Sequence, residues 1–180
     1  IVHRLDRMTS GVMVIAKTAE AHAFFKSQFQ GREIEKEYRA FVYGHPKEDG
    51  GVIEAEIRRT RTDPPRWTAE GGNYAKRRAA ITEWKVVRRG TDPTTGDEVS
   101  EIAAFPKTGR THQIRVHLLY MHHPVIGDPI YAPDKPALLG FTRLALHAYR
   151  LTLTLPTGEQ RTFEASLPQD FVEAEKRLTL

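Results

Sequence analysis

The chain opens with Ile1-Val-His-Arg4-Leu-Asp6-Arg7-Met-Thr-Ser-Gly-Val12-Met-Val-Ile-Ala16, and the rest of the sequence can be read outward from this stretch. Asp6 lies between Arg4 and Arg7, and neighbouring cations favour the ionised form of a carboxylate. The apolar run 12–16 has the pattern of a strand buried on both faces. We therefore expect a charged carboxylate on a turn that leads into a core strand. This suits either an enzyme acting on a polyanionic substrate or a turn-forming Asp in a surface ion pair.

The composition limits the class of protein. With 180 residues, 39% of them hydrophobic, the chain is sized for one domain with its own core. No apolar run approaches the roughly 18 residues of a membrane helix. Since there is no cysteine, disulfides and thiolate chemistry are excluded, and we expect a cytoplasmic protein. A net charge of +4 is compatible with a nucleic-acid partner but does not require one.

The spacing of apolar residues predicts helices and strands in mixed order. Thr18 can N-cap the first helix, and Gly31 can supply a left-handed stop. We expect helices at 18–31, 111–121 and 168–180, and strands at 12–16, 35–43, 52–57, 80–87, 98–105, 144–155 and 160–165. Many strands with interspersed helices predict an α+β fold, built on a mixed, mostly antiparallel sheet with flanking helices.

A second informative segment is Lys107-Thr-Gly-Arg110-Thr-His112-Gln-Ile114-Arg115-Val-His117. A glycine precedes a helix N-terminus, and such termini attract anions. Arg115 lies off the apolar stripe of the expected helix and is placed to meet a carboxylate in bidentate fashion. The alternative is an exposed helix with a basic face.

Histidines cluster here, but their spacing argues against a metal site. A zinc-binding helix needs two His four residues apart, whereas His112 and His117 are five apart, and no thiolate is available. We expect no metal and no cofactor, and we expect His117 to face the core with its ring hydrogen-bonded.

The stretch 60–78 has no regular period and reads as a long loop, and its run of basic residues begins just before it, at Arg58 and Arg59. It carries several arginines together with Lys76, Trp67 and Tyr74. Arginines and aromatic rings suit phosphates and unstacked bases, so this loop is either an RNA contact or a solvated loop.

Five motifs in order give the chain a resemblance to the RluA-type pseudouridine synthases along nearly its whole length. They are His3-Arg-Leu-Asp-Arg-Met-Thr-Ser-Gly11, Lys36-Glu-Tyr-Arg-Ala-Phe-Val42, Thr108-Gly-Arg-Thr-His-Gln-Ile-Arg-Val-His117, His123-Pro-Val-Ile-Gly-Asp-Pro-Ile-Tyr131, and Leu146-His-Ala148 through to Leu167-Pro-Gln-Asp-Phe171.

The resemblance implies roles for individual residues. Asp6 corresponds to the catalytic aspartate, Tyr38 to the tyrosine that packs on the target uracil, and Arg115 to the arginine that pairs with the aspartate. These three are the expected catalytic residues. The expected substrate-binding residues are Arg4, which fills the gap left by a flipped base, Ile114, which lines the pocket, Arg110 and His112.

The function implied by the resemblance is isomerisation of specific uridines to pseudouridine in ribosomal or transfer RNA by a monomer. We expect residues 1–180 to be a single catalytic domain. The family has a further N-terminal segment that is absent here, so we expect an N-terminally truncated domain, with either an incomplete sheet or a segment supplied from outside this chain. The rival hypothesis is a non-catalytic RNA-binding fragment that keeps the shape without turnover.

Overall fold

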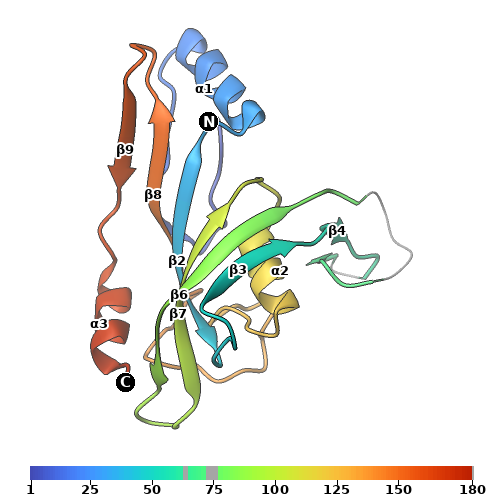
Figure 1. Ribbon diagram of the computed structural model, residues 1–180, viewed down its shortest axis with the longest axis vertical. Coiled ribbons are helices and arrows are strands. Elements are labelled where there is room, and N and C mark those ends of the chain that lie inside the picture. The colour runs from blue at the N-terminus through green and yellow to red at the C-terminus, as the bar shows by residue number, and fades with distance from the viewer. Residues whose placement is uncertain (63–64, 72–76, 180) are drawn as a thin grey trace.

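The computed structural model (Figure 1) describes residues 1–62, 65–71 and 77–179. Its elements follow one another along the chain as β1 (Ser10–Gly11), α1 (Ala19–Gly31), β2 (Glu35–Tyr43), β3 (Gly50–Glu54), β4 (Arg58–Arg59), β5 (Trp67–Thr68), β6 (Ile81–Thr91), β7 (Glu98–Pro106), α2 (Gln113–Tyr120), β8 (Leu146–Thr154), β9 (Gln160–Glu164) and α3 (Gln169–Arg177). In this part of the chain no helix has the length and apolar character needed to cross a membrane.

One mixed sheet of seven strands forms the centre of the molecule. The strand order is β1-β8-β2-β7-β6-β3, and β9 also pairs with β8. The β1–β8 pair is parallel, and the other pairs within this sheet are antiparallel. The predicted α+β class with a mostly antiparallel sheet is therefore confirmed.

The N-terminal strand differs from the prediction. Regular pairing covers only Ser10 and Gly11, opposite His147 and Ala148. Beyond it, residues 12–16 alternate between half-buried and exposed, with 61% of Ile15 exposed. The expectation of a strand buried on both faces was wrong, because this extended segment packs only one of its faces on the cluster around α1.

Gly11 explains how the N-terminal segment approaches β8 so closely. Its φ of +119° lies in a region that side chains with a Cβ rarely adopt. A Cβ at this position would also lie 2.1 Å from the carbonyl oxygen of Ala148. The glycine thus lets the turn that carries Asp6 lie directly against the sheet.

Helix α1 begins as predicted, but its left-handed stop lies one residue later than predicted. The Thr18 side chain accepts a hydrogen bond from the Ala21 amide at 3.2 Å, the N-cap that the sequence predicts. The left-handed residue at the C-terminal end is Arg32, with φ +61°, rather than Gly31. The helix packs through Phe25 against β8.

The two faces of β2 carry different layers of the molecule. Alternate side chains of a strand point to opposite faces. Tyr38 points to the face where Ile114 of α2 lies, whereas the Phe41 ring lies 5.5 Å from the Phe171 ring of α3. Helices α2 and α3 thus cover opposite faces of the central strand.

The segment 58–78, of which 60–78 was predicted to be a loop, is more ordered than predicted in its described parts. Strands β4 and β5 pair with each other, apart from the main sheet. Arg58 is 3% exposed, and Arg66 donates a hydrogen bond to the Ile130 carbonyl. These two arginines are therefore engaged with the protein, while Tyr74 and Lys76 lie outside the described residues.

Candidate active site

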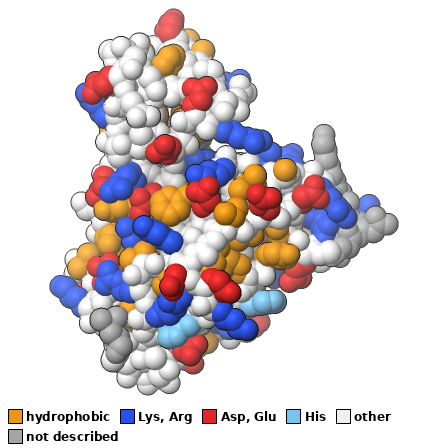
Figure 2. Space-filling model, in the orientation of Figure 1, with side chains coloured by type: hydrophobic (Ala, Val, Ile, Leu, Met, Phe, Trp, Pro, Cys, Tyr) orange, Lys and Arg blue, Asp and Glu red, His pale blue; other side chains and the backbone are white. Residues whose placement is uncertain are grey.

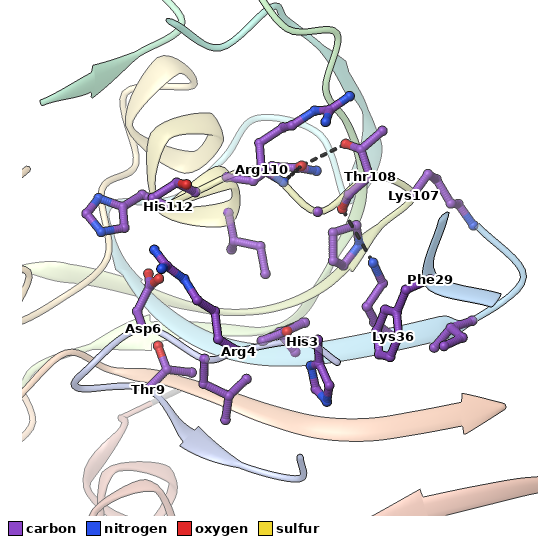
Figure 3. Close-up of a pocket in the computed structure, with 18 of the residues that line it drawn as sticks. His3, Arg4, Asp6, Thr9, Phe29, Lys36, Lys107, Thr108, Arg110 and His112 are labelled. Atoms are coloured by element: carbon purple, nitrogen blue, oxygen red, sulfur yellow. Dashed lines mark hydrogen bonds between the residues drawn. The ribbon is translucent and has the colours of Figure 1, made fainter. Parts of the chain in front are cut away.

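A pocket of about 630 Å³ opens between the N-terminal segment, the end of α1, β2 and the loop that leads into α2. Each of the seven residues expected to act in catalysis or substrate binding lines it: Arg4, Asp6, Tyr38, Arg110, His112, Ile114 and Arg115. Figure 3 labels four of them, Arg4, Asp6, Arg110 and His112. In Figure 2, Lys and Arg side chains gather where the lobe that holds α1 meets the body of the molecule. Positive charge of this kind suits a phosphate backbone.

Asp6 sits at the start of a tight turn. The Thr9 amide donates to the Asp6 carbonyl at 2.9 Å, and the chain then enters β1. The Asp6 carboxylate is 21% exposed and lies 3.2 Å from Nη1 of Arg115. In the described residues no ion pair joins Asp6 to Arg4 or Arg7, so the cation that pairs with Asp6 is a distant one.

Arg115 is held by a second carboxylate. Its Nε and Nη2 donate to the two oxygens of Asp128, both at 2.7 Å. Oδ1 of Asp128 is itself oriented by the backbone amides of Ile130 and Tyr131. The bidentate partner predicted for Arg115 therefore exists, but it is Asp128, and Asp6 receives the remaining nitrogen.

The electrostatics of this trio follow from burial and charge. Side-chain exposure is 5% for Arg115 and 0% for Asp128. Burial alone would lower the pKa of Arg115, but the hydrogen bonds and charges of Asp128 and Asp6 raise it. One guanidinium thus faces two carboxylates, and Asp6 is the more exposed of the two.

Tyr38 and Ile114 form walls of the same pocket. Burial, with the charge of Asp6 as a smaller cause, raises the pKa of Tyr38 to about 12. The phenol therefore stays protonated at neutral pH and offers a ring face and a hydroxyl rather than a base. Ile114 is 6% exposed and supplies an aliphatic surface from α2.

His112 and Arg110 lie at the start of α2. Nδ1 of His112 is 2.9 Å from the Tyr131 hydroxyl, whose oxygen also accepts from the Trp67 amide. Burial, followed by the charge of Arg115, lowers the pKa of His112. Arg110 donates through Nε to the Ala79 carbonyl at 3.1 Å.

Helix α2 itself is buried, and this decides between two interpretations of its sequence. Residues 113–118 are all buried, so the interpretation of this segment as an exposed helix with a basic face is wrong. His117 is fully buried, with its two ring nitrogens 2.9 Å from Oγ1 of Thr82 and 3.1 Å from the Ala55 carbonyl. The prediction of a core-facing, hydrogen-bonded histidine is confirmed.

Within the described residues, no group of three or more His, Asp or Glu is placed to hold a metal ion.

The geometry provides an oriented carboxylate, an aromatic face and an apolar wall in a positively charged pocket. This arrangement suits acid–base or nucleophilic chemistry on a flat, uncharged ring attached to an anionic chain.

The comparisons agree with this geometry. The family model for RNA pseudouridylate synthase matches residues 1–120. This chain belongs to the RNA pseudouridylate synthase family. It is 38% identical over 177 residues to the Ribosomal large subunit pseudouridine synthase D of Zymomonas mobilis, covering 94% of this chain and 53% of that protein. It is 40% identical over 171 residues to the Dual-specificity RNA pseudouridine synthase RluA of Escherichia coli K12, covering 94% of this chain and 73% of that protein.

Solved structures of RNA pseudouridylate synthases share the fold. Human RNA Pseudouridylate Synthase Domain Containing 1 superposes with a TM-score of 0.79 at 31% identity, covering 94% of this chain and 69% of that one. Human RNA Pseudouridylate Synthase Domain Containing 4 superposes with a TM-score of 0.77 at 26% identity, covering 98% of this chain and 74% of that one. The chain thus spans about half the length of the Zymomonas relative and about seven tenths of these structures.

Sequence reasoning assigned no role to three residues of the site: Lys36, Asp128 and Tyr131. Each stands inside one of the quoted motifs. A signal for Asp128 was present, since it is a carboxylate shortly after the arginine-bearing helix. No signal in the spacing showed that it would take two of the nitrogens of Arg115.

Proposed function

We propose that this chain isomerises uridine to pseudouridine in RNA, with Asp6 as its catalytic residue. One observation carries the proposal. Asp6, Tyr38 and Arg115 come from three distant segments and line one pocket, in a chain that belongs to the RNA pseudouridylate synthase family.

The reaction needs a uridine outside its helical stack, at a cost of roughly a few kcal/mol. Arg4, exposed at the pocket, offsets part of this cost by occupying the place of the flipped base. Tyr38 packs on one face of the uracil, and Ile114 supplies the apolar wall. Together they retain the base after it is detached.

Asp6 acts on the ribose, either by removing the proton at C2′ or by attacking C1′. Both routes need an ionised, oriented carboxylate, which Arg115 supports. In the first route the same proton returns to C2′ when the base rejoins through C5. The reaction consumes no water, so the pocket has only to hold and rotate the base.

The substrate class follows from the relatives. One is named for the ribosomal large subunit and another for dual specificity toward RNA. We accordingly propose a uridine in ribosomal or transfer RNA as the target, recognised in the cytoplasm by a monomer. Arg110 and His112 then contact the RNA beside the target.

Tritium release tests the proposal. RNA labelled at C5 of uridine loses its label when C5 becomes bonded to the ribose. We expect release with this chain, and a fall of about 10²–10⁴-fold with Asp6→Asn, the range for a lost acid–base group. Wild-type protein that binds RNA without releasing tritium would overturn the proposal and favour a non-catalytic RNA-binding role.

A further inference from the structure

Lys36 is a cation of the pocket that the proposed mechanism does not use. It lies on β2 two residues before Tyr38 and on the same face, about 7 Å farther along the strand. Its Nζ donates to the Thr108 carbonyl at 3.4 Å. Figure 3 shows Lys36 and Asp6 on opposite sides of the pocket, with Arg4 between them.

Lys36 is half-buried, and the described residues give its ammonium no counter-ion. In the described part of the chain no carboxylate lies within ion-pairing distance of it, whereas the neighbouring Lys107 pairs with Glu83 at 2.8 Å. A half-buried cation whose partner is a carbonyl oxygen and no carboxylate is costly unless a ligand supplies negative charge. The pocket therefore has an unmatched positive end opposite its carboxylate end.

The reaction creates negative charge at the corresponding place. When the N1–C1′ bond breaks, its electron pair leaves with the base, and the charge spreads over N1, O2 and O4. When C5 then bonds to C1′, C5 loses its proton to solvent and N1 gains one. In the pyrimidine ring, the carbon opposite N1 carries O4 and the carbon opposite C5 carries O2. The side of the base away from the ribose thus presents O4 before rotation and O2 after it.

We infer that Lys36 is a further catalytic residue, which binds O4 of the uracil before rotation and O2 after it, and stabilises the detached uracil anion. This inference rests on the proposed function and gives a catalytic role to the side of the same pocket that lies opposite Asp6. A fixed donor of this kind acts like an oxyanion hole, because it meets the charge only as that charge develops.

The electrostatic surroundings support this role. Burial lowers the pKa of Lys36 to about 8. The charged and titratable groups around the pocket are Arg4 and Asp6 near the N-terminus, Arg32 after α1, Lys107 and Arg110 before α2, and His112 and Arg115 at its start, together with His3 and Tyr38. Burial brings the pKa of His3 to about 4 and that of Tyr38 to about 12, so neither of them titrates near pH 8.

Single-turnover tritium release at saturating RNA tests the inference. We expect Lys36→Met to slow release by about 10²–10³-fold, as loss of one oxyanion donor does, while the Kd for RNA changes less than about threefold. Lys36→Arg restores part of the rate because it keeps the charge. The matched control is Lys85→Met on β6, an exposed lysine outside the pocket, for which we expect the wild-type rate.

The pH profile provides a second readout that a merely structural role would not move. In wild-type protein kcat/KM falls as pH rises through about 8, because the ammonium is lost. Lys36→Arg moves this basic limb to higher pH, and Lys85→Met leaves it in place. Titration of the RNA is common to all variants and so cancels from the comparison.

Three outcomes would overturn the inference while leaving the proposed function intact. The first is a wild-type rate of tritium release in Lys36→Met. The second is a Lys36→Met variant that loses only affinity for RNA, which indicates a phosphate contact. The third is a Lys36→Arg variant whose kcat/KM falls at the same basic pH as that of the wild-type protein. If Lys36→Met fails to fold, the pH profile of kcat/KM in Lys36→Arg still tests the inference. Failure of the proposed function is a different result, because wild-type protein itself then releases no tritium.

Discussion

At the scale of single residues, the site depends on how Arg115 divides its hydrogen bonds. Two of its nitrogens bind Asp128 and one binds Asp6. The fork with Asp128 fixes the plane of the guanidinium, so the third nitrogen points at Asp6 without help from substrate. The motifs predicted that Arg115 and Asp6 would meet, but they could not show that a second, fully buried carboxylate orients the arginine.

Asp128→Asn should therefore weaken both stability and turnover. The substitution breaks a buried pair, a change that typically costs 3–5 kcal/mol. We expect the free energy of unfolding in urea to fall by about 3 kcal/mol, because Arg115 keeps Asp6 as a partner. The single-turnover rate should fall by about 10²-fold, the effect of a misplaced reacting group.

Asp134→Asn is the matched control, since Asp134 is an exposed aspartate on the same loop. We expect it to change stability by less than about 0.5 kcal/mol. Equal stability and equal rates for the two variants would show that the fork does not position Arg115.

At the scale of secondary-structure elements, the sequence predicts most helices and strands because their apolar spacing is local information. The long strands β2, β6 and β7, the hairpin β8–β9 and all three helices lie where the spacing placed them. The errors concern elements set by tertiary contacts. The run 12–16 was predicted to be buried on both faces, and β5 was predicted to be part of a loop. Local composition shows neither that one face of the run 12–16 is exposed nor that β5 has β4 as its pairing partner.

Gly11→Ala tests the contact that places Asp6 against the sheet. A Cβ at Gly11 clashes with the Ala148 backbone in addition to the strained φ. We expect a loss of unfolding free energy of about 3 kcal/mol, and a lower rate because the turn carrying Asp6 moves.

Gly158→Ala separates the effect of backbone strain from the effect of a steric clash like the one at Gly11. Gly158 also has a positive φ, of +86°, but a Cβ there meets nothing within 4 Å. We expect a loss of about 1–2 kcal/mol from backbone strain alone and an unchanged rate. If both glycine variants behave alike in urea unfolding and in turnover, close approach at Gly11 is not what positions Asp6.

At the scale of the whole molecule, buried and half-buried histidines link stability to pH. Burial lowers the pKa of His3 to about 4 and also lowers the pKa values of His112, His117 and His147. Since the unfolded chain then binds more protons, this stabilisation is complete above about pH 6.5 and is lost as pH falls below it. The raised pKa of Glu101, caused by burial, acts in the opposite direction.

We therefore expect the free energy of unfolding in urea to be lower at pH 5.5 than at pH 7.5, with four histidines outweighing one glutamate. His117→Gln should reduce this pH dependence, because it removes one of the buried imidazoles. A free energy that stays constant or rises on acidification would contradict the assignment of neutral, buried histidines.

The most direct measurement is a crystal structure of the Asp6→Asn variant bound to an RNA from which the wild-type chain releases tritium. The result predicted here is a uridine flipped into the pocket, with its base against Tyr38 and Ile114 and its ribose beside residue 6. A target uridine bound outside this pocket, or a ribose far from residue 6, would contradict the assignment of the active site.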